Sequence, residues 1–224
     1  MANVPSGGVC FDIGAHKGGW TYWMRKAVGK QGAIWAFEPQ PTLHGYLDGI
    51  FSGNYWENVT LEHMALSNQT GTVEIFVPGG EDATSPGASL KQHVLEHEQE
   101  VHSTKVNAMP LEAYVEKNDI KSVDFIKLDV EGSELDVVES AGRVLTEFNP
   151  SWIIESEARH IGEDGVTALF DRMRDAGYDG FFFAPDGLKS LSEFSFEKFQ
   201  SQEGDRFWDR LDYCNNFLFT KAKH

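Results

Sequence analysis

A glycine-rich turn near the start of the chain has the residue types to hold a charged ligand. The stretch VCFDIGAHKGGWT, residues 9–21, has the pattern of a buried strand, a tight loop and the start of a helix. Its Gly14-x-x-x-Gly18-Gly19 spacing lacks the middle glycine of a dinucleotide fingerprint and the Gly-Lys-Ser/Thr of a P-loop. Asp12 at the strand end is a poor neighbour for a phosphate but can face an ammonium group, and a helix N-terminus can receive a carboxylate. The turn therefore favours a ligand with both charges and no phosphate, although a plain connection between two elements also fits.

Glu38 offers a second contact for the same ligand. It follows the apolar run Ala33–Phe37 and comes 24 residues after Gly14. An acidic residue at a strand end about 20 residues on can accept hydrogen bonds from both hydroxyls of a ribose. A 2′-phosphate would be repelled there. The two features together predict an adenosine ligand without a ribose phosphate, and S-adenosylmethionine carries the ammonium and carboxylate that the turn favours. On its own, Glu38 also fits a solvated charge at a strand end.

Alternating apolar and amphipathic segments indicate the elements that would position these residues. Strands are expected over 9–13, 33–37, 59–64, 72–78, 123–128, 152–154, 178–184 and 213–220. Helices are expected over 18–28, from Pro41, after residue 128 through Ser140, and over 164–176. This alternation predicts one three-layer α/β domain over residues 1–224 with a mostly parallel sheet. Such sheets bind ligands at the carboxyl ends of their strands, where the glycine turn falls.

Two segments interrupt the alternation and are expected to be cap-like insertions. The first covers residues 79–102 and ends in a polar, helix-like piece, and the second covers residues 190–210 and is rich in Phe, Glu and Gln. Long excursions in a compact domain are usually functional or disordered. In the second insertion, the aromatic residues either stack on a substrate ring or seal the edge of the sheet; they are Phe194, Phe196, Phe199 and Trp208.

Four motifs, in this order, resemble the FkbM family of class I methyltransferases. They are FDIGAHKGGWT (11–21), FEPQP (37–41), ALSN (65–68) and FIKLDVEGSELDVVESA (125–141). The resemblance covers residues 9–155 and continues more loosely to the end, and its last motif is the most specific. It implies a Rossmann-like sheet of seven strands, six parallel and the last antiparallel. It also implies S-adenosylmethionine as the methyl donor and, as acceptor, a hydroxyl oxygen of a sugar, glycan or natural product.

The resemblance, carried over by motif, assigns residues to the donor. The expected cofactor-binding set is Asp12, Gly14, Ala15, His16, Gly18, Glu38, Pro39, Ala65 and Leu66. Within it, the turn would line the methionine end, Glu38 would hold the ribose, and Ala65 and Leu66 would lie beside the adenine. Asp129 would lie near the reacting methyl group. The chain departs from the family pattern at residues 16–19 and in its two insertions, which leaves the acceptor open.

Methyl transfer to oxygen also requires a proton acceptor, because an alcohol is a poor nucleophile at neutral pH. Candidates gather where two strands are expected to end: Asp129 and Glu131 after one, and Glu155 after the next, with His160 just beyond. Histidine has an ordinary pKa suited to the role, and a carboxylate acquires one when burial or like-charged neighbours raise its pKa. We therefore expect these four residues to be catalytic, without deciding which one takes the proton. Glu134 is interpreted as a helix-start carboxylate.

Other functions match parts of the sequence. The segment HVLEH, residues 93–97, has the H-x-x-E-H pattern of some zinc peptidases, but it lies in an insertion and is expected to be a polar cap helix. No metal is required by the expected chemistry. A nicotinamide-dependent oxidoreductase would need the glycine that the turn lacks. A non-catalytic module that only binds an adenosyl ligand is a further alternative, against which the carboxylates of Asp129, Glu131 and Glu155 argue.

Charge and composition limit the expected partners. The 224 residues carry a formal net charge of −16, which would repel nucleic acid and anionic membrane surfaces. The two cysteines, Cys10 and Cys214, give no disulfide framework and favour a reducing compartment. No basic-then-apolar leader and no apolar run of membrane-spanning length is visible, so a cytoplasmic location is expected. The expected partner is a small-molecule or glycan acceptor, and the oligomeric state cannot be predicted from the sequence.

Overall fold

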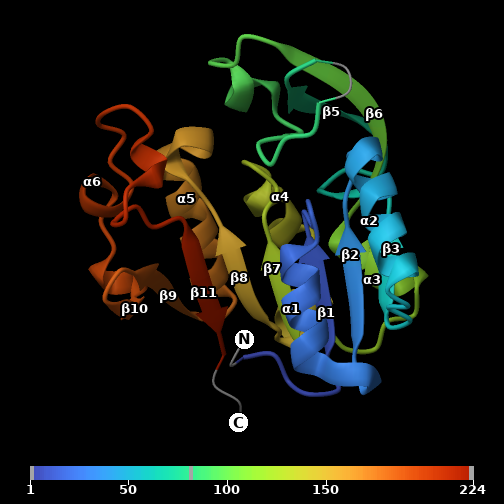
Figure 1. Cartoon of the computed structure of the whole chain (residues 1–224). Helices are drawn as coiled ribbons and strands as arrows, with labels where there is room; N and C mark the ends of the chain where they lie inside the picture. The colour runs from blue at the N-terminus through green and yellow to red at the C-terminus, as the bar shows by residue number, and fades with distance from the viewer. Residues whose placement is uncertain (1–2, 81–82, 222–224) are drawn as a thin grey trace.

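The computed structural model describes residues 3–80 and 83–221, which form a large sheet between two layers of helices and a small sheet at one end (Figure 1). In spatial order, the eight strands of the large sheet are β10 (Gly187–Ser190), β9 (Asp179–Ala184), β11 (Asn216–Thr220), β8 (Ser151–Glu155), β7 (Phe125–Leu128), β1 (Val9–Ile13), β2 (Ala33–Phe37) and β3 (Val59–Glu62). Neighbours from β3 to β8 pair in parallel, whereas β11 is antiparallel to β8 and β9, and β10 to β9.

The sheet confirms the α/β, mostly parallel architecture predicted from the sequence, including the antiparallel last strand β11. It has one strand more than the seven expected, because β10 folds back on β9 as a hairpin at the edge of the sheet. Gly187, the first residue of β10, has a φ of 130°, which glycine adopts readily and L side chains avoid. The extra strand lies at the edge remote from β1 and β2, so it leaves the strands around the glycine turn unchanged.

The two helix layers cover opposite faces of the large sheet. The helices on one face are α1 (Gly19–Val28), its extension η1 (Gly29–Gln31) and α2 (Pro41–Gly53), and those on the other are α3 (Leu111–Lys117), α4 (Glu134–Glu139), the π-helical η3 (Val144–Phe148) and α5 (Ala158–Asp175). Because successive residues of a strand point to opposite faces, Cys10 of β1 packs in the α1 layer and Phe11 packs in the other. The three layers follow from this alternation.

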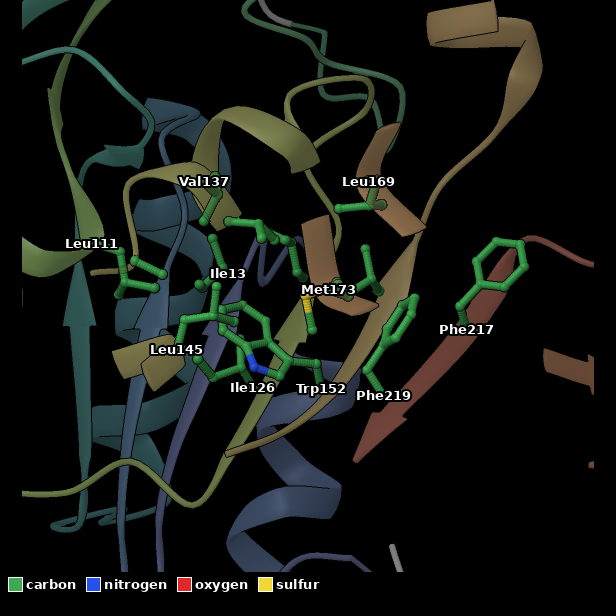
Figure 2. Packing of buried hydrophobic residues seen from close by; sticks show 14 of the residues in the cluster. Ile13, Leu111, Ile126, Val137, Leu145, Trp152, Leu169, Met173, Phe217 and Phe219 are labelled. Carbon is green, nitrogen blue, oxygen red and sulfur yellow. The ribbon is translucent and has the colours of Figure 1, made fainter. Parts of the chain in front are cut away.

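The larger core lies between the sheet and the α3–α5 layer. Figure 2 shows Ile13, Ile126 and Trp152, from β1, β7 and β8, packed with Val137 of α4 and Met173 of α5. All five side chains are buried, and burial of a side chain of this size contributes about 1.5–3 kcal/mol. This core fixes the ends of three neighbouring strands, on which the site is built.

The small sheet consists of β4 (Ala65–Leu66), β6 (Val101–Met109) and β5 (Gly71–Pro78), in that order. β5 and β6 pair antiparallel and arch over the carboxyl ends of the large sheet's parallel strands (Figure 1). The strand expected over 72–78 is confirmed, but the sequence patterns miss β6. The inward positions of β6 include His102 and Thr104, which weaken its apolar alternation.

The first insertion, from Gly79 to His102, differs from its prediction. Its described residues between β5 and β6, 83–100, are called the strap below, and they contain a single short 3₁₀ helix, η2 (Gln92–Leu95), rather than a polar α-helix. The 3₁₀ helix ends at Leu95, so His97 lies outside it, and His93 and His97 do not share the face of one α-helix as the peptidase pattern requires. Both histidines are exposed, and no group of three metal-ligating side chains occurs in ranges 3–80 and 83–221.

In the second insertion, one aromatic residue packs in the core and another faces a cavity. Its short helices are η4 (Leu191–Glu193), α6 (Phe196–Phe199) and η5 (Phe207–Asp209). Phe194 packs against Phe182 and Phe217 of the sheet at ring distances of 5.4 and 5.1 Å, so it seals the core. Trp208 instead is 43% exposed and faces the cavity described below.

Element boundaries shift by a few residues elsewhere. β3 ends at Glu62 rather than at residue 64, and α5 begins at Ala158 rather than at residue 164, although Gly162 interrupts its first turn. No helix among the described residues is long and apolar enough to cross a membrane. Cys10 and Cys214 are both free and buried.

Candidate active site

The glycine turn joins the ends of three strands through its backbone. The N–H groups of Gly14 and Ala15 both donate to the carbonyl oxygen of Phe37, at 3.1 and 2.9 Å, which ties the end of β1 to the end of β2. Gly14 has a φ of +85°, and a Cβ built on it would lie 1.8 Å from the carbonyl oxygen of Asp129, just beyond β7. Only glycine fits this approach, so the turn is fixed relative to β2 and β7.

Glu38 is held by the same turn. The residue is only 2% exposed, and its Oε2 accepts a hydrogen bond from the His16 N–H while its Oε1 accepts one from the Gln40 N–H, each at 2.8 Å. Burial raises the pKa of Glu38 to about 7, against the lowering effect of the two backbone donors. Each oxygen of a carboxylate has a second acceptor site, so the Glu38 carboxyl group can still accept hydrogen bonds from a ligand.

A cleft opens beside Glu38 at the carboxyl ends of β1, β2 and β7. This turn cleft has an empty volume of about 770 Å³ that includes its mouth, and its lining residues are Ile13, Gly14, His16, Phe37, Glu38, Pro39, Gln40, Met64, Ala65, Leu66, Ile75, Pro86, Ala88, Leu90, Asp129, Val130, Glu131 and Glu155. One side of the cleft is apolar and is covered by the strap residues Pro86, Ala88 and Leu90. The other side carries carboxylates. No lysine or arginine is among these described lining residues.

Three residues of the expected cofactor-binding set, Asp12, Ala15 and Gly18, lie outside the lining of the turn cleft. Ala15 packs in a small core with residues of α2, and Gly18 forms the left-handed N-cap of α1, with φ +78°. Asp12 is 0% exposed, and its Oδ2 accepts a hydrogen bond from the Thr21 hydroxyl. These three residues support the turn from beneath.

The Oδ1 atom of Asp12 has no hydrogen-bond partner within the part of the chain that the structure describes. Burial raises the pKa of Asp12 to about 6, although the Thr21 hydroxyl and the Lys127 cation oppose this shift. Because Asp12 is fully buried and lies outside the cleft lining, its carboxyl group belongs to the support of the turn and not to the surface that a ligand would contact.

A second cavity adjoins the turn cleft. This lateral cavity is lined by Pro78, Ser85, Pro86, Gly87, Val94, Leu95, Glu98, Glu131, Glu155, Glu157, Arg159, His160, Trp208 and Asn215. Pro86, Glu131 and Glu155 line both spaces, so the two meet at these residues. Of the four expected catalytic residues, Asp129 lines the turn cleft alone, His160 the lateral cavity alone, and Glu131 and Glu155 both.

A buried lysine lies beneath the junction. Lys127 of β7 is 0% exposed, with its Nζ 3.1 Å from Oδ2 of Asp129, 3.7 Å from Oε2 of Glu155 and 5.6 Å from the ring centre of Trp20. Burial and the neighbouring Asp129 raise the pKa of Glu155 to about 7, while Lys127 opposes them. Asn215 and the adjacent asparagine also donate to Glu155, at 2.7 and 3.2 Å.

Glu131 and His160 form a separate pair. Oε2 of Glu131 lies 3.0 Å from Nδ1 of His160. Burial, together with the carboxylates around it, raises the pKa of Glu131 well above its ordinary value. Burial and the nearby Arg159 lower the pKa of His160 to about 4, so its ring is neutral at neutral pH.

Glu157 braces the wall of the lateral cavity. Its carboxylate accepts hydrogen bonds from Nε and Nη2 of Arg159, at 2.7 and 2.9 Å, and from the Tyr213 hydroxyl, at 2.7 Å. Burial alone would raise the pKa of Glu157, but these donors and the Arg159 charge lower it below its ordinary value. The guanidinium also lies 5.2 Å above the ring of Trp208.

Sequence reasoning missed several residues of the two spaces. Gln40 holds the strap, since its Nε2 donates to the Ser85 carbonyl oxygen at 3.0 Å and its Oε1 accepts from the Ser85 N–H at 3.2 Å. Its place in FEPQP was an available signal. No sequence signal indicated the strap residues Pro86, Ala88 and Leu90, because the type of an apolar residue in an irregular segment does not show which site it covers.

Comparisons with known proteins agree with this geometry. The family model described as "Methyltransferase FkbM domain" matches residues 12–179. A curated relative, Methyltransferase 1 of Beauveria bassiana (strain ARSEF 2860), is 26% identical over 150 residues, which is 62% of this chain and 60% of that protein. The chain therefore spans less than two thirds of this relative's length.

Solved structures share the fold at low identity. Methyltransferase FkbM from Methylobacillus flagellatus KT has a TM-score of 0.57 and 17% identity, with 96% of this chain and 44% of that chain covered. A putative rRNA-methylase from Clostridium thermocellum has a TM-score of 0.52 and 10% identity, with 100% and 91% covered. Fibrillarin from Aeropyrum pernix, solved with natively bound S-adenosyl-L-methionine, has a TM-score of 0.52 and 12% identity, with 97% and 68% covered. At these identities the similarity shows the fold alone.

Proposed function

This chain belongs to the FkbM methyltransferase family, and we propose that it transfers a methyl group from S-adenosylmethionine to a hydroxyl oxygen of a sugar, a glycan or a similar hydroxyl-rich small molecule. The observation that carries the proposal is the junction of two spaces, one suited to the donor and one to an acceptor, at Glu131 and Glu155. A methyl group moves directly from the donor to the acceptor, so the reacting atoms must meet where the two binding sites join. The carboxylates of Glu131 and Glu155, which can accept a proton, lie at this junction.

The turn cleft fits the donor by its chemistry. Glu38 offers carboxylate oxygens for the two ribose hydroxyls, and the apolar side chains of Met64 and Leu66 suit an adenine ring. Asp129 and Glu155 supply negative charge for the donor's cationic end. The lack of a lysine or arginine along the described lining disfavours the pyrophosphate of a nicotinamide cofactor.

S-adenosylmethionine, when bound, supplies a methyl group that its sulfonium has already activated. The protein's own residues then have two tasks, which are alignment of the acceptor and removal of its proton. Positioning of two reactants accounts for a large part of such catalysis, and a base adds about 10²–10⁴-fold. Asp129, Glu131, Glu155 and His160 are the residues near the junction that can serve these tasks.

The lateral cavity favours a neutral, hydroxyl-bearing acceptor. Its carboxylates, Glu98, Glu131, Glu155 and Glu157, accept hydrogen bonds from hydroxyl groups and repel phosphates. Trp208 offers a ring face on which a sugar can lie. Together with the net charge of −16, this lining disfavours nucleic acid as acceptor. The buried free thiols of Cys10 and Cys214 suit the cytoplasmic location that we propose.

The test is calorimetric titration with S-adenosylmethionine, S-adenosylhomocysteine and NAD in parallel, followed by methyl-transfer assays on sugars and, for contrast, RNA. Both adenosyl ligands should bind and NAD should not. Glu38→Gln should weaken donor binding by about 10–100-fold, because a hydrogen bond to a charged group contributes about 1.5–3 kcal/mol.

Glu62→Gln is the matched control, since Glu62 accepts a hydrogen bond from the Tyr114 hydroxyl at 2.9 Å and is not part of the cleft lining. It should leave donor affinity unchanged. Failure of both adenosyl ligands to bind the wild-type protein would overturn the proposed function, and methylation of RNA in preference to sugars would overturn the proposed acceptor class.

A further inference from the structure

We propose that Glu131 and His160 act together as the proton acceptor of this site, with Nε2 of His160 removing the acceptor's hydroxyl proton and Glu131 holding the ring. The inference rests on the proposed function and deepens it, because it selects one pair from four candidates and gives its two members different roles. His160 is the catalytic residue in this assignment, and Glu131 is the positioning residue.

The geometry of the pair leaves one nitrogen available. Nδ1 of His160 faces Oε2 of Glu131 at 3.0 Å. Burial raises the pKa of Glu131, and once the carboxyl group is ionised above that pKa, it fixes the proton of the neutral ring on Nδ1. Nε2 then carries the lone pair, and no hydrogen bond to it occurs among residues 3–80 and 83–221. Since His160 lines the lateral cavity, this nitrogen can meet a hydroxyl group bound there.

The backbone around Glu131 is held in a conformation that side chains disfavour. Glu131 has a φ of +49° and Gly132 a φ of +95°, so two consecutive residues are left-handed. For a residue other than glycine this costs about 1–2 kcal/mol, and such strain persists where surrounding contacts impose it, often at functional sites. Here the Ser89 hydroxyl donates to the Glu131 carbonyl oxygen at 2.6 Å, which links the strap to the strained residue.

Two glycines, Gly132 and Gly162, help to place the ring of His160. A Cβ on Gly132 would lie 3.5 Å from Cβ of His160 and 3.1 Å from Cγ2 of Val94, so its absence allows the Glu131 loop to approach α5 closely. Gly162, with φ 72° and ψ 165°, breaks α5 after its first turn. The turn that carries His160 is therefore set apart from the remainder of α5.

The other carboxylates are already engaged. Asp129 and Glu155 share the buried cation of Lys127, and this ion pairing opposes the burial that raises the pKa of Glu155. Glu155 also accepts hydrogen bonds from two asparagines, and Glu157 is neutralised by Arg159. Glu131 has no lysine or arginine ion pair among the described residues, and its one charged-group partner is His160.

The reaction step balances with this assignment. The acceptor O–H bond breaks and its proton moves to Nε2, while the oxygen forms the new bond to the methyl carbon. The carbon–sulfur bond of the donor breaks, and its electron pair stays on sulfur. The imidazolium that results is stabilised by ionised Glu131 and later releases its proton to water.

The charges around the pair determine its pH dependence. The groups that face it are Asp129, Glu134, Glu155 and Glu157, with Arg159 as the cation. Because negative charges are in excess, they raise the pKa at which the pair of ionised Glu131 and neutral His160 binds one further proton. The competent form, with Glu131 ionised and His160 neutral, is therefore lost as the pH falls.

Two measurements test the pair. In donor-bound protein, ¹⁵N NMR of the histidine rings should show His160 with its proton on Nδ1, and Glu131→Gln should change this tautomer. In methyl-transfer assays that begin with methyl α-D-glucopyranoside among the sugars, His160→Ala and Glu131→Gln should each lower kcat by about 10²–10⁴-fold. Donor affinity should stay within about twofold, and added imidazole should partly restore His160→Ala.

The matched controls are His97→Ala and Glu96→Gln, at an exposed histidine and an exposed carboxylate of the strap that line neither space, and neither should lower kcat as much. Wild-type kcat should fall with decreasing pH through a single titration that His160→Ala removes. Normal kcat in His160→Ala with intact donor binding would overturn the pair alone, as would an Nε2-protonated ring in the wild type. Absence of donor binding in the wild-type protein would instead overturn the proposed function itself.

Discussion

The turn cleft and the lateral cavity meet at the same two carboxylates but are built in different ways. The turn cleft is shaped by backbone at the ends of β1, β2 and β7, where Gly14 and Ala15 bind the Phe37 carbonyl oxygen. The lateral cavity is shaped by side chains from the strap, the second insertion and the start of α5. The turn cleft is therefore tied to the sheet by its backbone, whereas most residues of the lateral cavity come from segments outside the large sheet.

This difference has a consequence for substitution. A change at the turn disturbs hydrogen bonds that join neighbouring strands, so it affects folding and donor binding together. A change in the lateral cavity, such as at Trp208, replaces a side chain on a segment that no sheet strand requires. The donor site should thus tolerate little variation, whereas the acceptor site can vary without loss of the fold.

The largest effect is expected for Gly14→Ala. The new Cβ would lie 1.8 Å from the Asp129 carbonyl oxygen, at a residue with φ +85°. Overpacking and the left-handed conformation together should lower the free energy of unfolding by about 3–5 kcal/mol. Urea denaturation followed by circular dichroism measures this loss, and donor binding should weaken with it.

Gly45→Ala is the control for this comparison. Gly45 lies within α2 and has no positive φ, and a Cβ added to it would meet no other part of the described chain within 4 Å. Alanine should therefore stabilise the protein by about 0.5–1 kcal/mol. Equal stability of Gly14→Ala and the wild type would show that the turn can relax away from β7, which would contradict the backbone-built view of the cleft.

An intermediate effect is expected from pH, because Glu157 is held differently from the other buried carboxyl groups. Burial raises to about 7 the pKa values of Glu38 in the turn cleft, Glu155 at the junction and Glu134, which lines neither space, whereas Glu157 in the lateral cavity has a lowered pKa beside Arg159. A carboxyl group with a raised folded-state pKa stabilises the fold below its unfolded pKa, and this contribution is lost as the pH rises through the folded value. Glu157 has the opposite sign and contributes no loss above pH 6.

We therefore expect the free energy of unfolding to fall by about 3 kcal/mol between pH 6 and pH 8. The lowered pKa of His160 partly offsets this fall, because it reduces stability as the pH drops below about 6.5 and costs about 1 kcal/mol at pH 6. Urea titrations across the window measure the slope. Glu134→Gln should reduce the fall by about 1 kcal/mol, and an unchanged slope in this variant would exclude Glu134 as a contributor.

The sequence predicted the turn cleft better than the lateral cavity for a physical reason. Gly14, Glu38 and Asp129 each follow an apolar strand directly, and parallel strands bring their carboxyl ends to one edge of a sheet. Strand periodicity alone thus places them together. The exceptions, Asp12 and Ala15, lie in the right segment but point beneath the turn, and only the three-dimensional path of the loop decides this.

The lateral cavity depends on contacts that no local pattern encodes. Glu131 and His160 are both visible as candidates, but their 3.0 Å pairing depends on two left-handed residues and a kink at Gly162. The α-helix predicted for the strap is wrong. The prediction used the helical spacing of HVLEH, whereas the conformation of the strap is set by its hydrogen bonds to Gln40 and Glu131. Long-range hydrogen bonds of this kind are formed between residues that sequence spacing does not relate.

The smallest effect, and the one that most sharply separates the two spaces, is expected for Trp208→Ala. Trp208 is 43% exposed, lies under the Arg159 guanidinium at 5.2 Å and lines only the lateral cavity. Loss of the ring face on which the sugar is proposed to lie should remove about 0.5–1 kcal/mol of contact and raise KM for a sugar acceptor by about 2–5-fold. Loss of the partly exposed cation–π contact should lower the free energy of unfolding by no more than about 0.5–1 kcal/mol. Donor Kd, measured by calorimetry, should not change, and Trp23→Ala on the exposed face of α1 should alter neither constant. A parallel rise of donor Kd and acceptor KM in Trp208→Ala would mean that the two spaces respond as one, because the ring would then be acting through the shared carboxylates rather than on the acceptor alone.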